Sequence, residues 1–227
     1  MITTVIFDLD DTLYDEIDFC RSGFRAVARS VAALSDYCPE DRVFDAIWQC
    51  FINANRRSTF DRALANLGIG FDPSLIARLV EIYRTHVPTL TLPPETRRTL
   101  NELQSRHALG LLTDGYLPTQ RLKVQALGIE HYFKAILYTE ELGREYWKPS
   151  PLGFEKLLQR LSARPEETAY VADNETKDFI APNQLGMFTV QLTRPSGLYR
   201  EPTARPEAAP RVKIDRIDKL AKVLAAF

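Results

Sequence analysis

Short apolar segments alternate with longer segments of mixed polarity along most of the chain. The apolar segments are TTVIFD at 3–8, ALGLLT at 108–113, KAILY at 134–138, TAYVAD at 168–173 and MFTVQL at 187–192. Each is nearly continuous in apolar residues, which is typical of parallel strands that are buried on both faces. Parallel strands need crossover connections, usually helices, which cover the faces of the sheet. The pattern therefore predicts an α/β fold built on an open, doubly wound parallel sheet.

Residues 15–90 follow a different pattern, in which apolar residues recur at spacings of three and four, as on the buried face of a helix. Two breaks, SDYCPED at 35–41 and GIGFDPS at 68–74, divide this stretch into separate helices. We therefore expect two domains. Residues 1–14 and 91–227 would form an α/β core, and residues 15–90 would form a helical domain inserted after the first strand.

Composition and charge limit the partners that we expect. The 227 residues carry a formal net charge of −1, with basic and acidic residues interspersed, so no broad basic field would attract nucleic acid or an anionic membrane. No apolar run approaches the ~20 residues of a membrane span, and no secretory signal precedes the first strand. Cys20, Cys38 and Cys50 lack a metal-binding spacing and are expected to be reduced, buried thiols. We expect a cytoplasmic protein that binds neither nucleic acid nor membrane.

Polar residues follow the predicted strands at the point where each strand ends. Asp8 ends the first apolar segment and Thr113 ends the second. Lys148 lies in the loop after the third segment, and Asp173 and Asp178 end and follow the fourth. In open parallel sheets, ligands bind at the carboxyl ends of the strands. We therefore expect carboxylates, a hydroxyl and an ammonium to share one site at this edge of the sheet.

Four motifs carry a resemblance to a known family. They occur in the order and rough spacing of the motifs of the haloacid dehalogenase superfamily: DLDDT at 8–12, LLTDG at 111–115, KPSP at 148–151 and ADNETKD at 172–178. The chain resembles a phosphatase of that superfamily over nearly its whole length. Residues 15–90 fall where such enzymes carry a helical cap, between the first two motifs. Ala172 departs from the family pattern, because Gly commonly precedes the first aspartate of the last motif.

The resemblance implies a reaction, and the residue types suit it. Hydrolysis of a phosphate monoester needs a nucleophile, neutralisation of charge and a proton for the leaving oxygen. Asp8 is expected to be the nucleophile that forms an aspartyl-phosphate. Asp10, which lies on the same side if the strand continues, is expected to protonate the leaving group and then to deprotonate water. Asp11 points the other way and is expected to accept hydrogen bonds from nearby backbone N–H groups.

A divalent cation is implied at the same place. Three carboxylates in one loop repel each other, and a hard cation with oxygen ligands relieves that repulsion. The resemblance implies Mg²⁺ held by Asp8, by the backbone carbonyl of Asp10 and by Asp173. Asp178 is expected to orient either a metal-bound water or Lys148. The residues expected at the substrate phosphate are Thr113, Asp114 and Lys148.

Substrate choice is harder to predict. We expect a small phosphorylated metabolite, either a sugar phosphate or a nucleotide, selected by the inserted domain. There Arg56 and Arg57 are candidates to bind a second anionic group of the substrate. A phosphomutase shares Asp8 and Asp10, so the motifs leave that activity open, as they do a non-catalytic phosphate-binding protein. A haloacid dehalogenase is disfavoured, because that branch departs from the second aspartate of the DxD pattern, which is intact here.

Overall fold

The chain is organised in two compact units. The computed structural model describes residues 1–34, 38–53, 58–194, 197 and 205–227. One unit is formed by Met1–Ile17 together with Thr91–Phe227, and the other by Asp18–Leu90. In the described ranges, no helix is both long enough and apolar enough to cross a membrane.

The first unit is built on a parallel sheet. Over the described residues the sheet has six strands in the order β3-β2-β1-β4-β5-β6, and every neighbouring pair is parallel. The strands are β1 (Thr4–Phe7), β2 (Ala108–Thr113), β3 (Ala135–Tyr138), β4 (Thr168–Ala172), β5 (Phe188–Leu192) and β6 (Val212–Ile214). The first five coincide with the apolar segments of the sequence, so the predicted parallel α/β sheet is confirmed.

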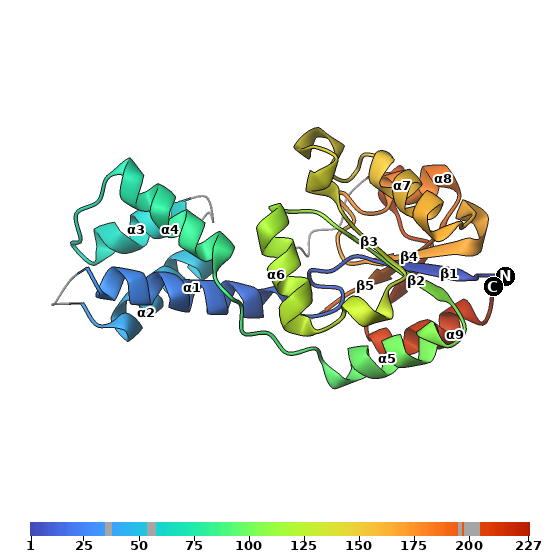
Figure 1. Ribbon diagram of the computed structural model, residues 1–227, viewed down its shortest axis with the longest axis horizontal. Coiled ribbons are helices and arrows are strands. Elements are labelled where there is room, and N and C mark those ends of the chain that lie inside the picture. Colours follow the sequence, from blue (N-terminus) through green and yellow to red (C-terminus); the bar gives the residue numbers. More distant parts are fainter. Residues whose placement is uncertain (35–37, 54–57, 195–196, 198–204) are drawn as a thin grey trace. The chain divides into compact units, whose positions relative to one another are not determined.

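Helices cover both faces of this sheet. Helix α7 (Leu152–Leu161) packs on β2 and β3, and α8 (Ile180–Leu185) packs on β5. Helices α5 (Pro94–Gln104) and α9 (Leu220–Leu224) pack together, and Figure 1 shows them on the other side of the sheet from α7 and α8. The sheet is therefore doubly wound, as predicted. The unit also contains α6 (Leu117–Leu127) and the 3-10 helices η2 (Glu130–Tyr132), η3 (Thr139–Glu141), η4 (Arg144–Tyr146), η5 (Pro165–Glu167), η6 (Pro206–Ala208) and η7 (Ile217–Lys219).

Large apolar side chains fill the space between the sheet and helices α7 and α8. Ile6 and Leu112 from the strands pack in one cluster with Phe154 of α7 and with Phe179. The Phe154 ring meets the Tyr170 ring edge to face, with centroids 4.9 Å apart. Tyr170 is fully buried, yet its hydroxyl is bonded to polar residues at the carboxyl edge of the sheet. Its ring therefore links the core to the candidate site.

The second unit is helical and has an aromatic core. Phe24 is only 3% exposed, and its ring lies 5.1 Å from the Phe51 ring and 5.4 Å from the Tyr83 ring, between centroids. The helices are α1 (Glu16–Ala32), α2 (Glu40–Asn53), α3 (Thr59–Asn66) and α4 (Pro73–Thr85), and the first two residues of α1 belong to the first unit. The three cysteines, Cys20, Cys38 and Cys50, are buried and none of them forms a disulfide, as predicted.

The sheet register brings the motif-bearing strand ends together. Strand β1 lies between β2 and β4, and Phe7 at its end pairs with Leu111 and with Val171. The backbone N–H of Asp8 donates to the carbonyl of Val171 at 2.9 Å. Asp8 therefore emerges at the centre of the carboxyl edge, flanked by the residues that follow β2 and β4.

Candidate active site

A buried ammonium joins the loops that follow β1 and β4. Lys148 Nζ donates to Oδ1 of Asp8 at 2.5 Å and to Oδ1 of Asp178 at 2.7 Å. It also donates to the hydroxyl oxygen of Tyr170 at 3.0 Å, and that hydroxyl donates to Asp178 Oδ1 at 3.1 Å. The Lys148 side chain is 1% exposed. One buried cation thus binds both Asp8 and Asp178.

The charges of this cluster depend on burial and on one another. Burial raises the pKa of Asp8 to about 6, although the nearby Lys148 ammonium opposes the rise. Burial lowers the pKa of Lys148, but Asp178 and Asp8 outweigh it and hold that pKa well above its ordinary value. Burial also raises the pKa of Asp178, but Lys148 and Lys177 hold it below its ordinary value. Lys148 is therefore a fixed cation beside Asp8.

Asp173 completes a group of carboxylates that suits a divalent cation. Asp8, Asp173 and Asp178 can each offer one oxygen, and these three atoms lie within 4.8 Å of one another. Burial and the carboxylates of Asp178 and Asp8 raise the pKa of Asp173 to about 9, so an added positive charge would be favourable there. Both oxygens of Asp178 accept protein hydrogen bonds, Oδ1 from Lys148 and Oδ2 from the Asn174 N–H. Asp8 and Asp173 are therefore the better candidates to hold Mg²⁺, and Asp178 supports Lys148.

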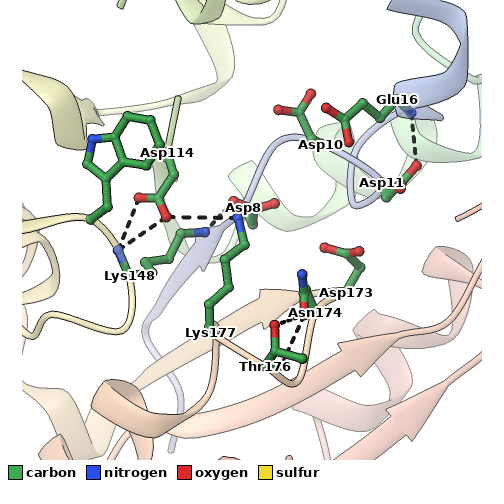
Figure 2. Close-up of a pocket in the computed structure, with 11 residues that line it drawn as sticks. Asp8, Asp10, Asp11, Glu16, Asp114, Lys148, Asp173, Asn174, Thr176 and Lys177 are labelled. Atoms are coloured by element: carbon green, nitrogen blue, oxygen red, sulfur yellow. Dashed lines mark hydrogen bonds and ion pairs between the residues drawn. The ribbon is translucent and has the colours of Figure 1, made fainter. Parts of the chain in front are cut away.

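Asp10 is bound by residues of α6 and of its own loop. Lys123 Nζ donates to both Asp10 oxygens, at 2.8 and 2.9 Å. Gln120 Nε2 donates to Oδ2 at 3.0 Å, and the Tyr14 hydroxyl donates to Oδ1 at 2.5 Å. Burial raises the pKa of Asp10, but Lys123 and these hydrogen bonds hold it below its ordinary value. Figure 2 shows the Asp10 carboxylate directed away from Asp8 and toward Glu16.

The chain path after β1 explains this orientation. Strand β1 ends at Phe7, so the alternation of a strand does not continue through Asp10, and the two-residue spacing no longer fixes its side. Asp11 adopts a positive φ of 52°, and its Oδ1 accepts the backbone N–H of Glu16 at 2.9 Å. Asp11 thus accepts a backbone hydrogen bond, as expected, at the first residue of α1.

In the second motif, Thr113 contacts α6 and Asp114 lines the pocket. Thr113 Oγ1 accepts from Gln120 Nε2 at 2.6 Å, and Thr113 is not among the described residues that line the pocket. Asp114 does line the pocket, where it accepts from the Thr139 hydroxyl at 2.7 Å and from the Lys148 N–H at 3.1 Å. Asp114 therefore ties the loop that carries Lys148 to the end of β2.

These side chains open onto a pocket of about 420 Å³ in the first unit (Figure 2). The predicted residues Asp8, Asp10, Lys148 and Asp173 all line it, whereas Asp178 is fully buried against Lys148. The candidates Arg56 and Arg57 lie outside the described residues.

Comparisons with known proteins identify the family. A family model described as haloacid dehalogenase-like hydrolase matches residues 5–192. The chain belongs to the haloacid dehalogenase-like hydrolase family. It is 32% identical to a glyceraldehyde 3-phosphate phosphatase of Methanopyrus kandleri over 99% of this chain and 97% of the relative. An enzyme of the same name from Methanocaldococcus jannaschii is 32% identical over 88% of each chain.

A solved structure supports the same assignment. The crystal structure of a 2-haloacid dehalogenase from Pseudomonas syringae is 27% identical, with a TM-score of 0.63, and the match covers 100% of this chain and 99% of that one. Within the haloacid dehalogenase-like hydrolases, the sequence matches to phosphatases identify this chain as an enzyme, a phosphatase.

Several site residues of this haloacid dehalogenase-like hydrolase were not predicted from the sequence, among them Lys177, Gln120 and Lys123. Lys177 lines the pocket with its Nζ 3.8 Å from Asp114 Oδ2, and its place between the two aspartates of ADNETKD was a usable signal. Gln120 and Lys123 lie three residues apart on α6, on the face that also buries Val124 and Leu127. Polar residues within a buried helical stripe indicate a polar partner inside the fold.

Proposed function

We propose that this phosphatase is a Mg²⁺-dependent phosphomonoester hydrolase that acts on a small phosphorylated metabolite through an aspartyl-phosphate at Asp8. The observation that carries the proposal is the Lys148 ammonium on Asp8, at a pocket that Asp10 and Asp173 also line. A carboxylate nucleophile and an anionic phosphate ester repel each other. A fixed cation beside the attacking oxygen reduces that repulsion. Its effect is greatest in the transition state, where negative charge is spread over the nucleophile and the phosphoryl oxygens.

In the first step, a carboxylate oxygen of Asp8 would attack the phosphorus atom. The bond between phosphorus and the leaving oxygen breaks, and that oxygen takes a proton from Asp10. Asp10 must carry this proton when the ester binds, although Lys123 favours its ionised form. The attacking and leaving oxygens lie roughly in line on opposite sides of phosphorus. A proton donor therefore belongs on the far side of the phosphate from Asp8, and Asp10 lines the same pocket as Asp8.

In the second step, Asp10 would act as the base. It takes a proton from water, the water oxygen attacks phosphorus, and the bond between phosphorus and Asp8 breaks. Inorganic phosphate leaves, Asp8 is restored as a carboxylate, and Asp10 carries the proton needed for the next turnover.

The residues present fit a bound Mg²⁺. Asp8 and Asp173 would hold it through carboxylate oxygens and Asp10 through its backbone carbonyl, while Asp178 would hold Lys148 in place. When bound, the ion supplies positive charge that offsets the carboxylates and the transferring phosphoryl group. Burial, and then the carboxylates of Asp178 and Asp8, raise the pKa of Asp173 to about 9, and a bound cation would offset that negative charge.

The relatives favour a small sugar phosphate as the first substrate class to test. Two of them are named glyceraldehyde 3-phosphate phosphatase. A pocket of about 420 Å³ lies within the range of small-molecule sites. We propose that residues 15–90 act as a cap that selects the substrate, with Arg56 and Arg57 as candidate contacts. Support comes from the compact helical unit Asp18–Leu90, which has its own aromatic core.

A panel of phosphate esters tests this function. Release of inorganic phosphate from glyceraldehyde 3-phosphate, other sugar phosphates, nucleotides and nitrophenyl phosphate would be measured with Mg²⁺ and with excess chelator. We expect release from at least one metabolite, loss in chelator, recovery with Mg²⁺ and no release by Asp8→Asn. The exposed Asp215→Asn is the matched control and should keep the wild-type rate. Absence of release from every ester would contradict the proposal, and so would isomerisation activated by a sugar bisphosphate without net phosphate release.

A further inference from the structure

The Asp10 carboxylate has its hydrogen-bonding capacity filled by protein groups. Among the described residues, Oδ1 accepts from Tyr14 and Lys123, and Oδ2 accepts from Lys123 and Gln120. A carboxylate offers about four acceptor sites, so these bonds use nearly all of its capacity. The orientation of Asp10 is therefore set by its protein partners, even though its side chain is 20% exposed to the pocket.

Lys123 lies closer to the Asp10 carboxylate than to the Glu16 carboxylate. Its side chain is 4% exposed, and both of its bonds to Asp10 are shorter than 3 Å. Its Nζ lies 3.8 Å from Oε1 of Glu16, which is an ion-pair distance without a hydrogen bond. One ammonium that donates to both oxygens restricts the orientation of the Asp10 carboxylate and favours its ionised form.

Gln120 links Asp10 to the second motif through hydrogen bonds to both Asp10 and Thr113. Its Nε2 donates to Asp10 Oδ2 at 3.0 Å and to Thr113 Oγ1 at 2.6 Å. An amide nitrogen carries two hydrogens, so one side chain satisfies both acceptors. Because Thr113 accepts from Gln120, the Thr113 hydroxyl hydrogen is available for another acceptor.

Both residues stand on one anchored helix. Gln120 and Lys123 are three residues apart on α6 and share its buried face with Val124 and Leu127. The helix ends at Gly128, whose φ of 63° is the left-handed conformation that glycine adopts without strain. The position of α6 therefore determines where these two side chains hold the Asp10 carboxylate.

We infer that Lys123 and Gln120 are positioning residues, which hold the Asp10 carboxylate in the orientation for proton transfer and couple that orientation to Thr113. This inference rests on the proposed hydrolysis with Asp10 as acid and base. Both residues donate to the Asp10 carboxylate and would act on the reaction through it. A displacement of about 1 Å in a proton donor is enough to lower a rate by about 10²-fold.

The test compares leaving groups in single turnover. Release of a nitrophenol and of glycerol from their phosphate esters would be timed for wild type, Lys123→Met, Gln120→Met and Asp10→Asn. A nitrophenol leaves readily as an anion, whereas an alkoxide needs a proton. We expect each α6 variant to slow glycerol release at least about tenfold more than nitrophenol release. Arg121→Met and Gln125→Met, at exposed positions of the same helix, should leave this ratio unchanged.

A double-mutant comparison separates positioning from a structural role. In the Asp10→Asn background, Lys123→Met should add no further discrimination between the two esters, because the group that it positions no longer acts. Equal slowing of both esters, or the same added discrimination without Asp10, would overturn the inference. If Lys123→Met shows no cooperative melting, Gln120→Met decides the question. If the wild type hydrolyses neither ester, both the proposed function and this inference are wrong. If the variants are active and the ratio of glycerol release to nitrophenol release is unchanged, only this inference is wrong.

Discussion

Nζ of Lys148 lies 2.7 Å from Oδ1 of Asp178, and neither side chain is more than 1% exposed. Asp178 accepts this bond together with those of the Tyr170 hydroxyl and the Asn174 N–H. It is thus held on several sides and fixes the ammonium that contacts Asp8. A cation held in this way needs little reorganisation when charge develops on a transferring phosphoryl group.

Replacement of Lys148 should reveal this contribution. Lys148→Met leaves the buried carboxylates of Asp8 and Asp178 without their shared cation, so we expect phosphate release to fall by about 10²–10³-fold. The melting temperature should also fall, since removal of one partner leaves buried charge uncompensated. Steady-state kinetics and thermal melts measure both effects. Lys156→Met, at an exposed position of α7, is the control, and a Lys148→Met rate close to that of wild type would contradict the role.

Stabilisation by Mg²⁺ should depend on pH. The pKa of Asp173 rises from 3.8 to about 9, so the folded metal-free protein holds this proton more tightly than the unfolded chain. The resulting stability is complete below the unfolded pKa and is lost as the pH rises toward 9; Asp8, with its pKa raised to about 6, adds in the same direction. In the proposed site Mg²⁺ would take the place of the proton, so it should raise the melting temperature more at about pH 8 than at about pH 5.

Asp173→Asn supplies the control for that measurement. Without this carboxylate, the Mg²⁺-induced rise in melting temperature should largely disappear at both pH values, whereas the exposed Asp215→Asn should retain it. Equal Mg²⁺ effects at the two pH values, or an undiminished effect in Asp173→Asn, would show that Asp173 does not hold the ion.

The rate loss in Asp10→Asn should depend on the leaving group more than the loss in Asp8→Asn does. Asp10→Asn keeps the nucleophile but removes the proton donor, a contribution of about 10²–10⁴-fold for a leaving group that needs a proton. Single-turnover release of glycerol should therefore slow far more than release of a nitrophenol. The first step must be observed directly, because in the proposed mechanism Asp10 also acts as base in the second. Equal losses for the two esters would remove Asp10 from the role of general acid.

The stability of the helical unit should depend on its aromatic core. Phe24→Ala removes a ring that contacts the rings of Phe51, Phe60 and Tyr83, and we expect it to lower the free energy of unfolding by about 3–5 kcal/mol. Phe71, which is 42% exposed, provides the control, since Phe71→Ala should change stability by less than about 0.5 kcal/mol. Denaturant titration of both variants measures the difference, and similar values would contradict the assignment of this core.

The strand ends could be predicted from the sequence because their signals are local. Asp8 and Asp173 directly follow apolar segments, and the rule that ligands bind at the carboxyl ends of parallel strands brings them together without knowledge of the packing. Lys148 is more distant, but its motif is local as well. The structure places all three at one pocket.

The surroundings of Asp10 could not be predicted in the same way. Lys123 and Gln120 reach it across 113 and 110 residues of sequence, through the packing of α6 that no local pattern records. The path of the chain beyond Phe7 also depends on the Asp11 conformation, a positive φ at a residue other than glycine. Strand alternation therefore no longer applies from Asp8 onward. For this reason it could not predict the direction of the Asp10 side chain.

The central claim, a covalent phosphoryl group on Asp8, can be tested most directly by trapping it. The enzyme would be mixed with Mg²⁺ and an excess of its best ester, quenched in acid within the first turnover, digested and analysed by mass spectrometry. We predict one phosphoryl group on the peptide that contains Asp8, formed as fast as the alcohol is released and absent in Asp8→Asn. Turnover by the wild type with no such adduct, together with an active Asp8→Asn, would contradict the account.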